Sequence, residues 1–557
     1  MSLTSYEFAL IFLPISVFGF WSLRRRFGRE PALWWLILLS VLFYARASLI
    51  GFGILLPSIL LDFLIARALL RTDNSRARVR SALFLVGVSA NIVFLGYFKY
   101  RNFFLDTAEN LTGSHFSLTP LLLPLGISFL TFQKIAFLAD VAAGFIQSLS
   151  LQEYLLFTLF FPRTIAGPIV HYQELIPQFA NSSPKDLLDS LVGGIALFSI
   201  GMFKKAVIAN GIAEFVPYSG AGPITLFFAW SSALAYLFQL YFDFSGYSDM
   251  ALGAARLFGV KLPMNFNSPL KSTSMVEYWG RWHITLTRFL TWYIYIPLVR
   301  HITRWRVTTG RTVLRGVNSQ ASAVVSLIGI PTLITMTISG LWHGAGWQFV
   351  VWGLLHGFYL TVNQTWRMFR PRFWPNTANY ERVMRPLGFA LTFLCVVIAL
   401  VIFQAGSLSS ASSRLAAMAG LHGVLPQYAQ ILQGMNIDSH WIFFWRPFRP
   451  FGWLLVLLVA TVSLPNSLEL LRRFHPALDL PENKRVHSGQ DETSPLANDG
   501  GRRPEPTRVR EKFGAAWRRI GAEGIPLSRL TASILAILSA WGLLALSHAG
   551  GFIYEKF

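Results

Sequence analysis

The chain has 557 residues, of which 53% are hydrophobic and 13% are charged, whereas a soluble globular chain carries roughly 25% charged residues. This balance, with a mean hydropathy of +0.48, excludes a disordered chain, a secreted disulfide-rich scaffold and an ordinary soluble enzyme. The net charge of +21 comes from short basic blocks between apolar runs, so it indicates membrane topology and contact with the lipid bilayer instead of nucleic-acid binding.

Long apolar runs follow one another along most of the chain. Several are short for a span or carry Pro, Gly or a charge, so we predict an all-α polytopic membrane bundle of roughly 11–14 membrane segments, some of them broken or re-entrant, each complete span taking about 20 residues. The candidate runs are 6–23, 31–45, 49–70, 82–98, 120–139, 151–170, 190–210, 224–242, 284–299, 321–340, 346–363, 386–405, 451–465 and 528–547.

Basic blocks orient this bundle. Arginines cluster at 24–29, after the first run, and at 71–80, after the third. By the positive-inside rule both blocks face the cytoplasm, which places the N-terminus outside. No small-residue cleavage site follows the first run, so it is expected to be a retained helix.

The segment 471–519 is the main polar interruption. It holds eleven basic and seven acidic residues and several prolines, a composition that cannot bury enough apolar surface to order itself. We therefore expect a membrane core over 1–470, a disordered cytoplasmic loop over 471–519, and a final transmembrane helix within 520–557 that leaves the C-terminus outside.

Polar residues within apolar runs cost free energy in a membrane and need a reason. In the first such stretch, Pro162, Gly167 and Pro168 prevent a regular helix. Irregular backbone at membrane depth is tolerated where it lines a cavity or is buried in protein. A helix end at the membrane interface explains the same residues equally well.

A second polar stretch begins directly after the run 224–242. Asp243, Ser245 and Asp249 lie among aromatic residues, and helix capping or an arginine partner explains the two aspartates as well as substrate contact does. The stretch continues through Asn265 and Asn267 to a segment with Arg281 and His283. For Trp279 and Trp282 in that segment, we favour an interfacial helix with both rings at headgroup depth.

The third stretch places His343 after Trp342 and between glycines 340, 344 and 346. This leaves room for a ligand to approach the imidazole ring, and a neutral imidazole suits a general base for a hydroxyl group. No serine nucleophile elbow or metal-ligand spacing competes with it. For His356, on the next apolar run, we favour a role in the core or in a helix contact.

Together these stretches resemble the membrane-bound O-acyltransferase family, and within it the bacterial branch that includes the membrane subunit of alginate O-acetylation. The matching motifs are Phe161-Pro162 with Ala166-Gly167-Pro168-Ile169-Val170, Phe242-Asp243-Phe244-Ser245-Gly246-Tyr247-Ser248-Asp249-Met250-Ala251, Asn265-Phe266-Asn267, Arg281-Trp282-His283-Ile284 and Leu341-Trp342-His343-Gly344. The likeness runs from about residue 6 to residue 405 in order and spacing.

The resemblance implies that His343 is the catalytic base and that His283 is the second functional histidine, which binds or polarises the carbonyl of the acyl donor. It implies that the remaining motif residues contact substrate. These are Trp342, Asp243, Ser245, Asp249, Asn265, Asn267, Arg281, Pro162, Gly167 and Pro168.

The resemblance further implies a bundle around a central tunnel in a bacterial inner membrane, with no metal or permanently bound cofactor. The orientation given above then places both termini in the periplasm. Acetyl-CoA would be the cytoplasmic donor, and a periplasmic or membrane-anchored SGNH-type partner would pass the acetyl group to an exopolysaccharide such as alginate or cellulose. One alternative within the family is D-alanyl transfer to teichoic acid. An alternative from another class is a transporter or flippase, against which stand the lack of repeated halves and the glycine-flanked histidine.

The sequence also departs from the family. Thr291-Trp292 stand where relatives usually carry Arg-Asp, and Arg163-Thr164 stand where Gln-Leu is common. Because the motifs with both histidines are kept, we expect these departures to affect the acceptor and the partner surface.

Overall fold

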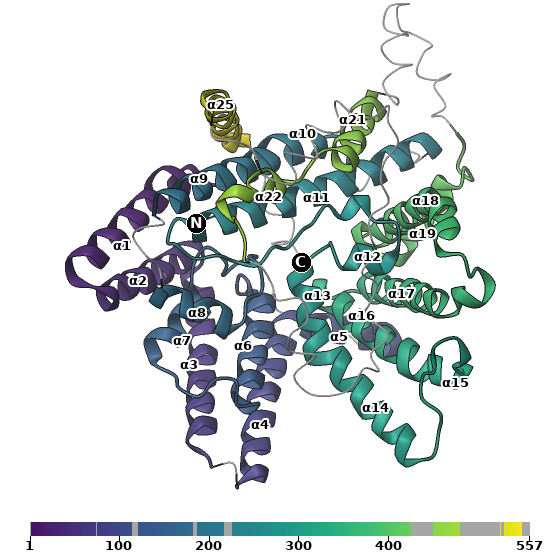
Figure 1. Ribbon diagram of the computed structural model, residues 1–557, viewed down its shortest axis with the longest axis horizontal. Coiled ribbons are helices and arrows are strands. Elements are labelled where there is room, and N and C mark those ends of the chain that lie inside the picture. Colours follow the sequence, from purple (N-terminus) through teal and green to yellow (C-terminus); the bar gives the residue numbers. More distant parts are fainter. Residues whose placement is uncertain are drawn as a thin grey trace, which may run out of the picture.

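The computed structural model describes residues 2–73, 75–113, 121–181, 187–216, 225–424, 449–478, 524 and 528–548. Within these residues the regular structure is helical, apart from one isolated bridge between Pro263 and Leu478. Figure 1 shows helices crossing one another at many angles around the long helix α11. The predicted all-α architecture is therefore confirmed.

The first half of the chain forms α1 (Leu13–Phe27), α2 (Arg29–Ala47), α3 (Leu49–Arg71), α4 (Ala77–Leu95), α5 (Arg101–Thr112), α6 (Ile127–Ala142), α7 (Leu151–Leu159), α8 (Tyr172–Asn181), α9 (Leu187–Phe203), α10 (Asn210–Ala213) and α11 (Leu226–Arg256). The second half forms α12 (Met275–Trp279), α13 (Ile284–Leu290), α14 (Ile296–Thr308), α15 (Ala321–Val324), α16 (Ile330–His343), α17 (Trp347–Phe373), α18 (Thr377–Gln404), α19 (Leu408–Met418), α21 (Arg449–Ser463), α22 (Ser467–Leu470) and α25 (Arg529–Ala545). Wider π-helical turns join or extend several of them, namely η1 (Glu7–Phe12), η2 (Gly96–Tyr100), η4 (Lys204–Ala209), η6 (Thr291–Tyr295) and η8 (Val325–Gly329).

Seven helical segments in the described part of the chain are long and apolar enough to cross a membrane, and two further apolar helices are shorter. The protein is therefore a multi-pass membrane protein. Each predicted run contains a helix, but their ends differ in two places that matter for function. The run 151–170 is helical only as far as Leu159, and the helix predicted to end near 242 continues to Arg256.

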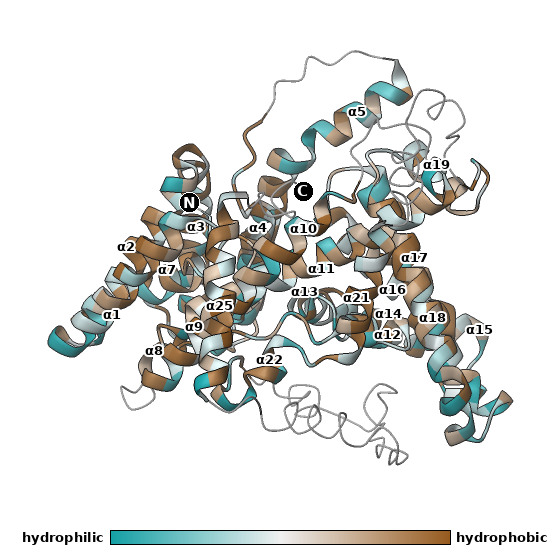
Figure 2. Ribbon diagram, turned by 90° about the horizontal axis from the view of Figure 1, so that it is seen from above, coloured by the Kyte–Doolittle hydropathy of each residue, from teal (hydrophilic) through white to brown (hydrophobic). Residues whose placement is uncertain are grey.

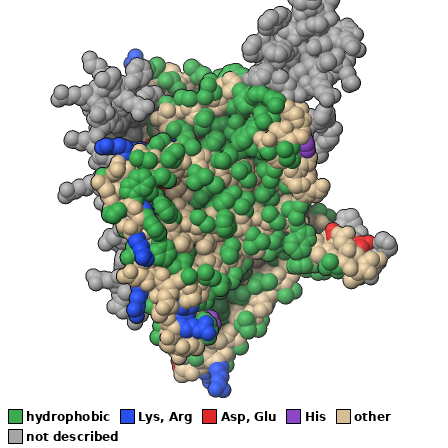
Figure 3. Space-filling view, turned by 90° about the vertical axis from the view of Figure 1, so that its right-hand side faces the viewer, with side chains coloured by type: hydrophobic (Ala, Val, Ile, Leu, Met, Phe, Trp, Pro, Cys, Tyr) green, Lys and Arg blue, Asp and Glu red, His purple; other side chains and the backbone are tan. Residues whose placement is uncertain are grey.

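The outer surfaces of these helices are apolar. On α18, Leu387, Leu391 and Leu394 recur at the spacing of one helix face, and all three are exposed. Figure 3 shows hydrophobic side chains over most of one face of the molecule, with Lys and Arg near its margin. Figure 2 likewise shows hydrophobic residues along the helices and hydrophilic ones at ends such as that of α1. Such a surface suits contact with lipid.

Charges inside the bundle are paired between helices. Lys134 of α6 lies 3.2 Å from Asp62 of α3, and Asn91 of α4 donates to the same carboxylate at 2.8 Å. A charge removed from water needs such partners, since breaking one buried pair is costly. These contacts tie three neighbouring helices together in one arrangement.

The two basic turns lie beside the same stretch of chain. Arg80 donates to the carbonyl of Ala142, at the end of α6 (3.1 Å), while Gln152, at the start of α7, donates to the carbonyl of Glu30 (3.1 Å). Both basic turns therefore contact the short connection between α6 and α7. This agrees with the prediction that both turns lie on the same side of the membrane. Which side is cytoplasmic stays a prediction.

Most of the predicted loop 471–519 and the residues after 548 lie outside the described residues.

Candidate active site

His343 is the last residue of α16, and the close packing of α16 on α17 decides what lies beside it. A Cβ atom on Gly340 would overlap the carbonyl oxygen of Phe349, and one on Gly353 would overlap that of Met336. Glycine at both positions therefore lets the two helix backbones approach closely, as small residues do at membrane helix interfaces. This approach brings His343 against Trp352 of α17, with ring centroids 5.1 Å apart.

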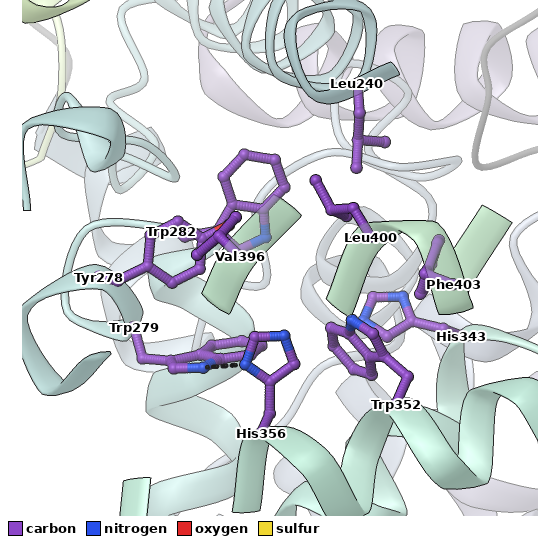
Figure 4. Close-up of a pocket in the computed structure, with 10 residues that line it drawn as sticks. All are labelled: Leu240, Tyr278, Trp279, Trp282, His343, Trp352, His356, Val396, Leu400 and Phe403. Carbon is purple, nitrogen blue, oxygen red and sulfur yellow. Dashed lines mark hydrogen bonds between the residues drawn. The ribbon is translucent and has the colours of Figure 1, made fainter. Parts of the chain in front are cut away.

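A cavity opens beside His343 (Figure 4). The space within it that no atom fills is about 320 Å³, open solvent included. Its lining residues come from α11, α12, α16, α17, α18 and the turn after α12, and they are Leu240, Tyr278, Trp279, Trp282, His343, Trp352, His356, Val396, Leu400 and Phe403. Apart from the two histidines, the cavity is walled by aromatic and aliphatic side chains, so a reacting group inside it is shielded from water.

Of two sequence-based interpretations of cavity residues, the one for Trp279 and Trp282 is wrong and the one for His356 is confirmed. Trp279 and Trp282 were expected at headgroup depth, but each is only 4% exposed and lines the cavity. His356 does contact a neighbouring helix, since Trp279 donates to its Nδ1 at 3.2 Å, yet it also faces the cavity. The segment 275–283 therefore folds into the protein, where its aromatic residues meet α17.

His283 is held by its neighbour Asn265. The residue caps α13 with φ +45°, a left-handed conformation in which His and Asn are enriched. Asn265 Oδ1 accepts from the Thr285 backbone N–H at 3.4 Å and lies 3.0 Å from His283 Nδ1. Because that oxygen only accepts, Nδ1 carries the proton. In a neutral ring the lone pair is then on Nε2, so His283 offers an acceptor there and no donor.

Trp342 lies between the two predicted catalytic histidines. Its ring centroid is 4.9 Å from that of His343 and 5.9 Å from that of His283. The same indole stacks on Phe132, which in turn stacks on Phe289. Both histidines thus contact one aromatic core, although His343 lines the cavity and His283 does not.

Sequence reasoning missed Lys99, which lies at the end of the helix that carries His343. Its ammonium donates to the carbonyl of Trp342 at 2.5 Å and to Ser128 Oγ at 3.1 Å. Tyr100 adds a hydrogen bond to the carbonyl of Leu341 at 2.5 Å. A signal was present, since a lysine that ends an apolar run within a membrane protein is a candidate functional residue.

The two aspartates predicted to contact substrate form ion pairs with lysines. Asp243 pairs with Lys205, and Asp249 pairs with Lys204 at 2.8 Å and accepts from Ser467 at 2.7 Å. These contacts hold α11 to η4, which continues α9, and to α22, and neither carboxylate lines the cavity. The sequence left open whether an arginine pairs with these aspartates. In the structure each aspartate does have a basic partner, which is a lysine. Contact of either aspartate with substrate stays a prediction.

The remaining predicted residues lie around the histidines without lining the cavity. Ser245 is buried on α11, and its hydroxyl has no partner among the described residues. Asn267 accepts from Asn466 at 3.2 Å. Arg281, about one-third exposed, pairs with Glu277 at 2.9 Å.

The segment with Pro162, Gly167 and Pro168 is not helical and is buried throughout 160–172. Its backbone N–H at Ile169 donates to Thr285 Oγ1 of α13 at 3.1 Å. Of the two interpretations left open by the sequence, irregular backbone buried in protein is therefore correct. The segment supports α13, whose first turn follows His283.

Trp292, at the main departure from the family pattern, lies away from the cavity. Its ring is 4.9 Å from that of His171, and the Arg288 guanidinium lies over it at 5.4 Å. Arg288 pairs with Glu174 at 2.8 Å. The departure thus lies in a polar cluster near α8.

Within the described residues, no group of three His, Cys, Asp or Glu side chains could hold a metal ion.

A helical membrane protein that buries a histidine in the wall of an aromatic cavity has the plan of an integral-membrane enzyme. Comparison with known proteins identifies which kind. The sequence model of the membrane-bound O-acyltransferase family matches residues 98–311. The chain is 35% identical to the peptidoglycan O-acetyltransferase of Helicobacter pylori over 83% of this chain and 89% of that protein.

Two further relatives mark the range of this similarity. A probable alginate O-acetylase of Azotobacter vinelandii is 34% identical over 75% of this chain and 78% of its own length. The teichoic acid D-alanyltransferase of Streptococcus thermophilus is 29% identical over 50% of this chain and 68% of its own. The protein belongs to the membrane-bound O-acyltransferase family, and it is an O-acyltransferase.

Proposed function

We propose that this enzyme moves acetyl groups from acetyl-CoA toward a cell-surface polysaccharide by way of a periplasmic partner, with His343 as general base for the acceptor hydroxyl. The observation that carries the proposal is the position of His343, 3% exposed, in the wall of a cavity lined by aromatic and aliphatic groups. Relatives named O-acetyltransferase or O-acetylase, two of which match 83% and 75% of this chain, favour acetyl as the transferred group.

In the proposed reaction the acceptor oxygen attacks the thioester carbonyl carbon while a ring nitrogen of His343 takes the hydroxyl proton. The carbonyl π electrons move onto oxygen and give a tetrahedral oxyanion. When the C=O bond re-forms, the C–S bond breaks, and the thiolate leaves with the proton held by His343. The products are the acetyl ester and free thiol, so no protein nucleophile is needed.

The geometry of His283 refines its proposed role. A neutral ring whose Nδ1 proton is bound to Asn265 Oδ1 (3.0 Å) has only an acceptor at Nε2. It could polarise a carbonyl only as an imidazolium. We therefore infer that His283 accepts a hydrogen bond from a substrate group, and that the donor to the developing oxyanion is a different residue.

We also propose an inner-membrane location, with acetyl-CoA bound from the cytoplasm and an SGNH-type partner receiving the acetyl group on the outer side. The relatives named for alginate and peptidoglycan support a polysaccharide acceptor. A neighbouring gene for an SGNH-type protein would favour this arrangement. A neighbouring carrier-protein and ligase pair would favour D-alanylation, for which the named relatives match only half of this chain.

The test is transfer by the purified protein in lipid nanodiscs. With the SGNH-type partner added, we expect labelled acetyl-CoA to give acetyl ester on a polysaccharide acceptor, and a D-alanyl-loaded carrier protein to give none. His343→Ala should lower the rate by about 10²–10⁴, the usual contribution of a general base. His343→Gln should be nearly as damaging, because glutamine forms hydrogen bonds but does not take a proton. Near-normal transfer by His343→Ala would contradict the mechanism.

A further inference from the structure

The geometry points to Trp352 and His356 as the pair of hydrogen-bond donors that stabilises the oxyanion formed beside His343. This inference rests on the proposed function, because it assigns a role in the acyl-transfer step. Acyl transfer places negative charge on the carbonyl oxygen of the donor, and enzymes meet such charge with donors that are already in position.

Trp352 brings an N–H group into the cavity and has nothing to bind there. The residue is 4% exposed, and its Nε1 has no acceptor among the described residues. An indole nitrogen is a donor only, and leaving a buried donor unsatisfied costs about 1–3 kcal/mol. Buried polar groups are normally paired, so this exception needs an explanation, and an oxygen atom of a bound substrate supplies one.

His356 presents a second donor to the same space. Trp279 Nε1 donates to its Nδ1 at 3.2 Å, and a nitrogen that accepts carries no proton. The proton of the neutral ring is therefore on Nε2. In Figure 4 this outer nitrogen and the indole nitrogen of Trp352 face the same part of the cavity. The two ring centroids are 4.6 Å apart.

The pair is close enough to His343 to act on one substrate carbonyl. The Trp352 and His343 ring centroids are 5.1 Å apart and their planes are almost perpendicular. A thioester could therefore place its carbonyl carbon near His343 and its oxygen toward Trp352 and His356. The wall formed by α18, with Val396, Leu400 and Phe403, is apolar, and hydrogen bonds to charge are stronger where water is excluded.

During the reaction one electron pair moves from the carbonyl bond to its oxygen and back. When the acceptor oxygen bonds to the carbonyl carbon, the π pair moves to the carbonyl oxygen, where the Trp352 and His356 N–H groups bind it. Neither residue gives up its proton, and the proton of the acceptor goes to His343. When the pair returns to form C=O, the thiolate leaves with that proton. The two donors thus stabilise charge that exists only transiently.

The decisive variant is Trp352→Phe, measured as kcat and KM for acetyl-CoA with the full-length protein in nanodiscs. Loss of one such donor lowers kcat by about 10²–10³, and KM should change by only a few-fold. Incorporation of 3-benzothienylalanine at position 352 removes the N–H and keeps the ring shape, so it separates lost packing from a lost hydrogen bond. Trp230→Phe is the matched control, because Trp230 donates to the carbonyl of Met418 (3.0 Å) outside the cavity.

His356 gives an independent readout. His356→Leu should lower kcat, and His356→Gln, whose amide N–H can occupy the place of Nε2–H, should recover part of it. Wild-type kcat in the benzothienylalanine protein, with His343→Ala inactive, would overturn the donor assignment and leave the proposed function standing. Active His343→Ala, or no acetyl transfer by the wild type, would overturn both.

Discussion

Lys99 Nζ lies 2.5 Å from the carbonyl oxygen of Trp342 and 3.4 Å from that of His343. A half-buried ammonium therefore caps the C-terminal end of α16, where the helix dipole and the free carbonyl groups favour a cation. The last turn of this helix carries both Trp342 and His343. The position of the proposed base is thus set from η2, a segment more than two hundred residues earlier in the chain.

Lys99→Met should lower acyl transfer without preventing membrane insertion. A hydrogen bond to a charged group contributes about 1.5–3 kcal/mol, so loss of order at His343 is expected to cost roughly tenfold or more in kcat. The measurement is the transfer rate in nanodiscs, with Arg101→Met as a control from the next residue but one. Unchanged kcat in Lys99→Met would show that α16 keeps its end without the ammonium.

His283→Asn should keep partial activity, and His283→Ala should be worse. Residue 283 has φ +45°, which asparagine tolerates and alanine does not, and an asparagine side chain can still donate to Asn265. The transfer rates of the two variants are to be compared with their thermal stability, because the alanine variant should lose both. Equal and complete loss of activity in two folded variants would indicate that His283 takes part in proton transfer.

Single cysteines should report the orientation of the bundle once Cys395 is replaced by alanine. We expect Arg26→Cys, Ser75→Cys and Gln490→Cys to be protected from a membrane-impermeant maleimide in intact cells, since all three lie in segments predicted to be cytoplasmic. Thr112→Cys, one span further on, should be labelled. Labelling of position 490 from outside would reverse the assignment of that loop.

A Gly/Ser linker in place of residues 480–505 should leave acetyl transfer within a few-fold of normal. The composition of this segment does not favour a packed core, and the replacement begins beyond Leu478, whose N–H donates to the carbonyl of Leu262 at 2.9 Å. Transfer and insertion are measured together. A protein that inserts but is inactive would assign the loop a regulatory or partner-binding role.

The sequence by itself determined the class of this protein. Apolar runs of spanning length exclude a soluble fold, because the backbone in a bilayer must satisfy its own hydrogen bonds and does so as helix. The polar motifs within those runs pointed to His343 and His283, since each such residue needs a reason to be there. Proline and glycine at 162–168 predicted broken backbone for the same local reason, and that segment is indeed irregular and buried.

Only the tertiary structure decided which polar groups meet. Helical spacing shows which residues share a face of one helix, but it does not show which helix covers that face. Asp243 of α11, for example, pairs with Lys205 of η4, and the two residues are close only because these two helices pack together. The roles of Lys99 and Trp352 likewise depend on partners from distant segments. From the sequence, a lysine or a tryptophan with a functional role in an apolar run cannot be told from one that only packs. The distinction needs the neighbouring residues, which show whether its hydrogen bonds are satisfied.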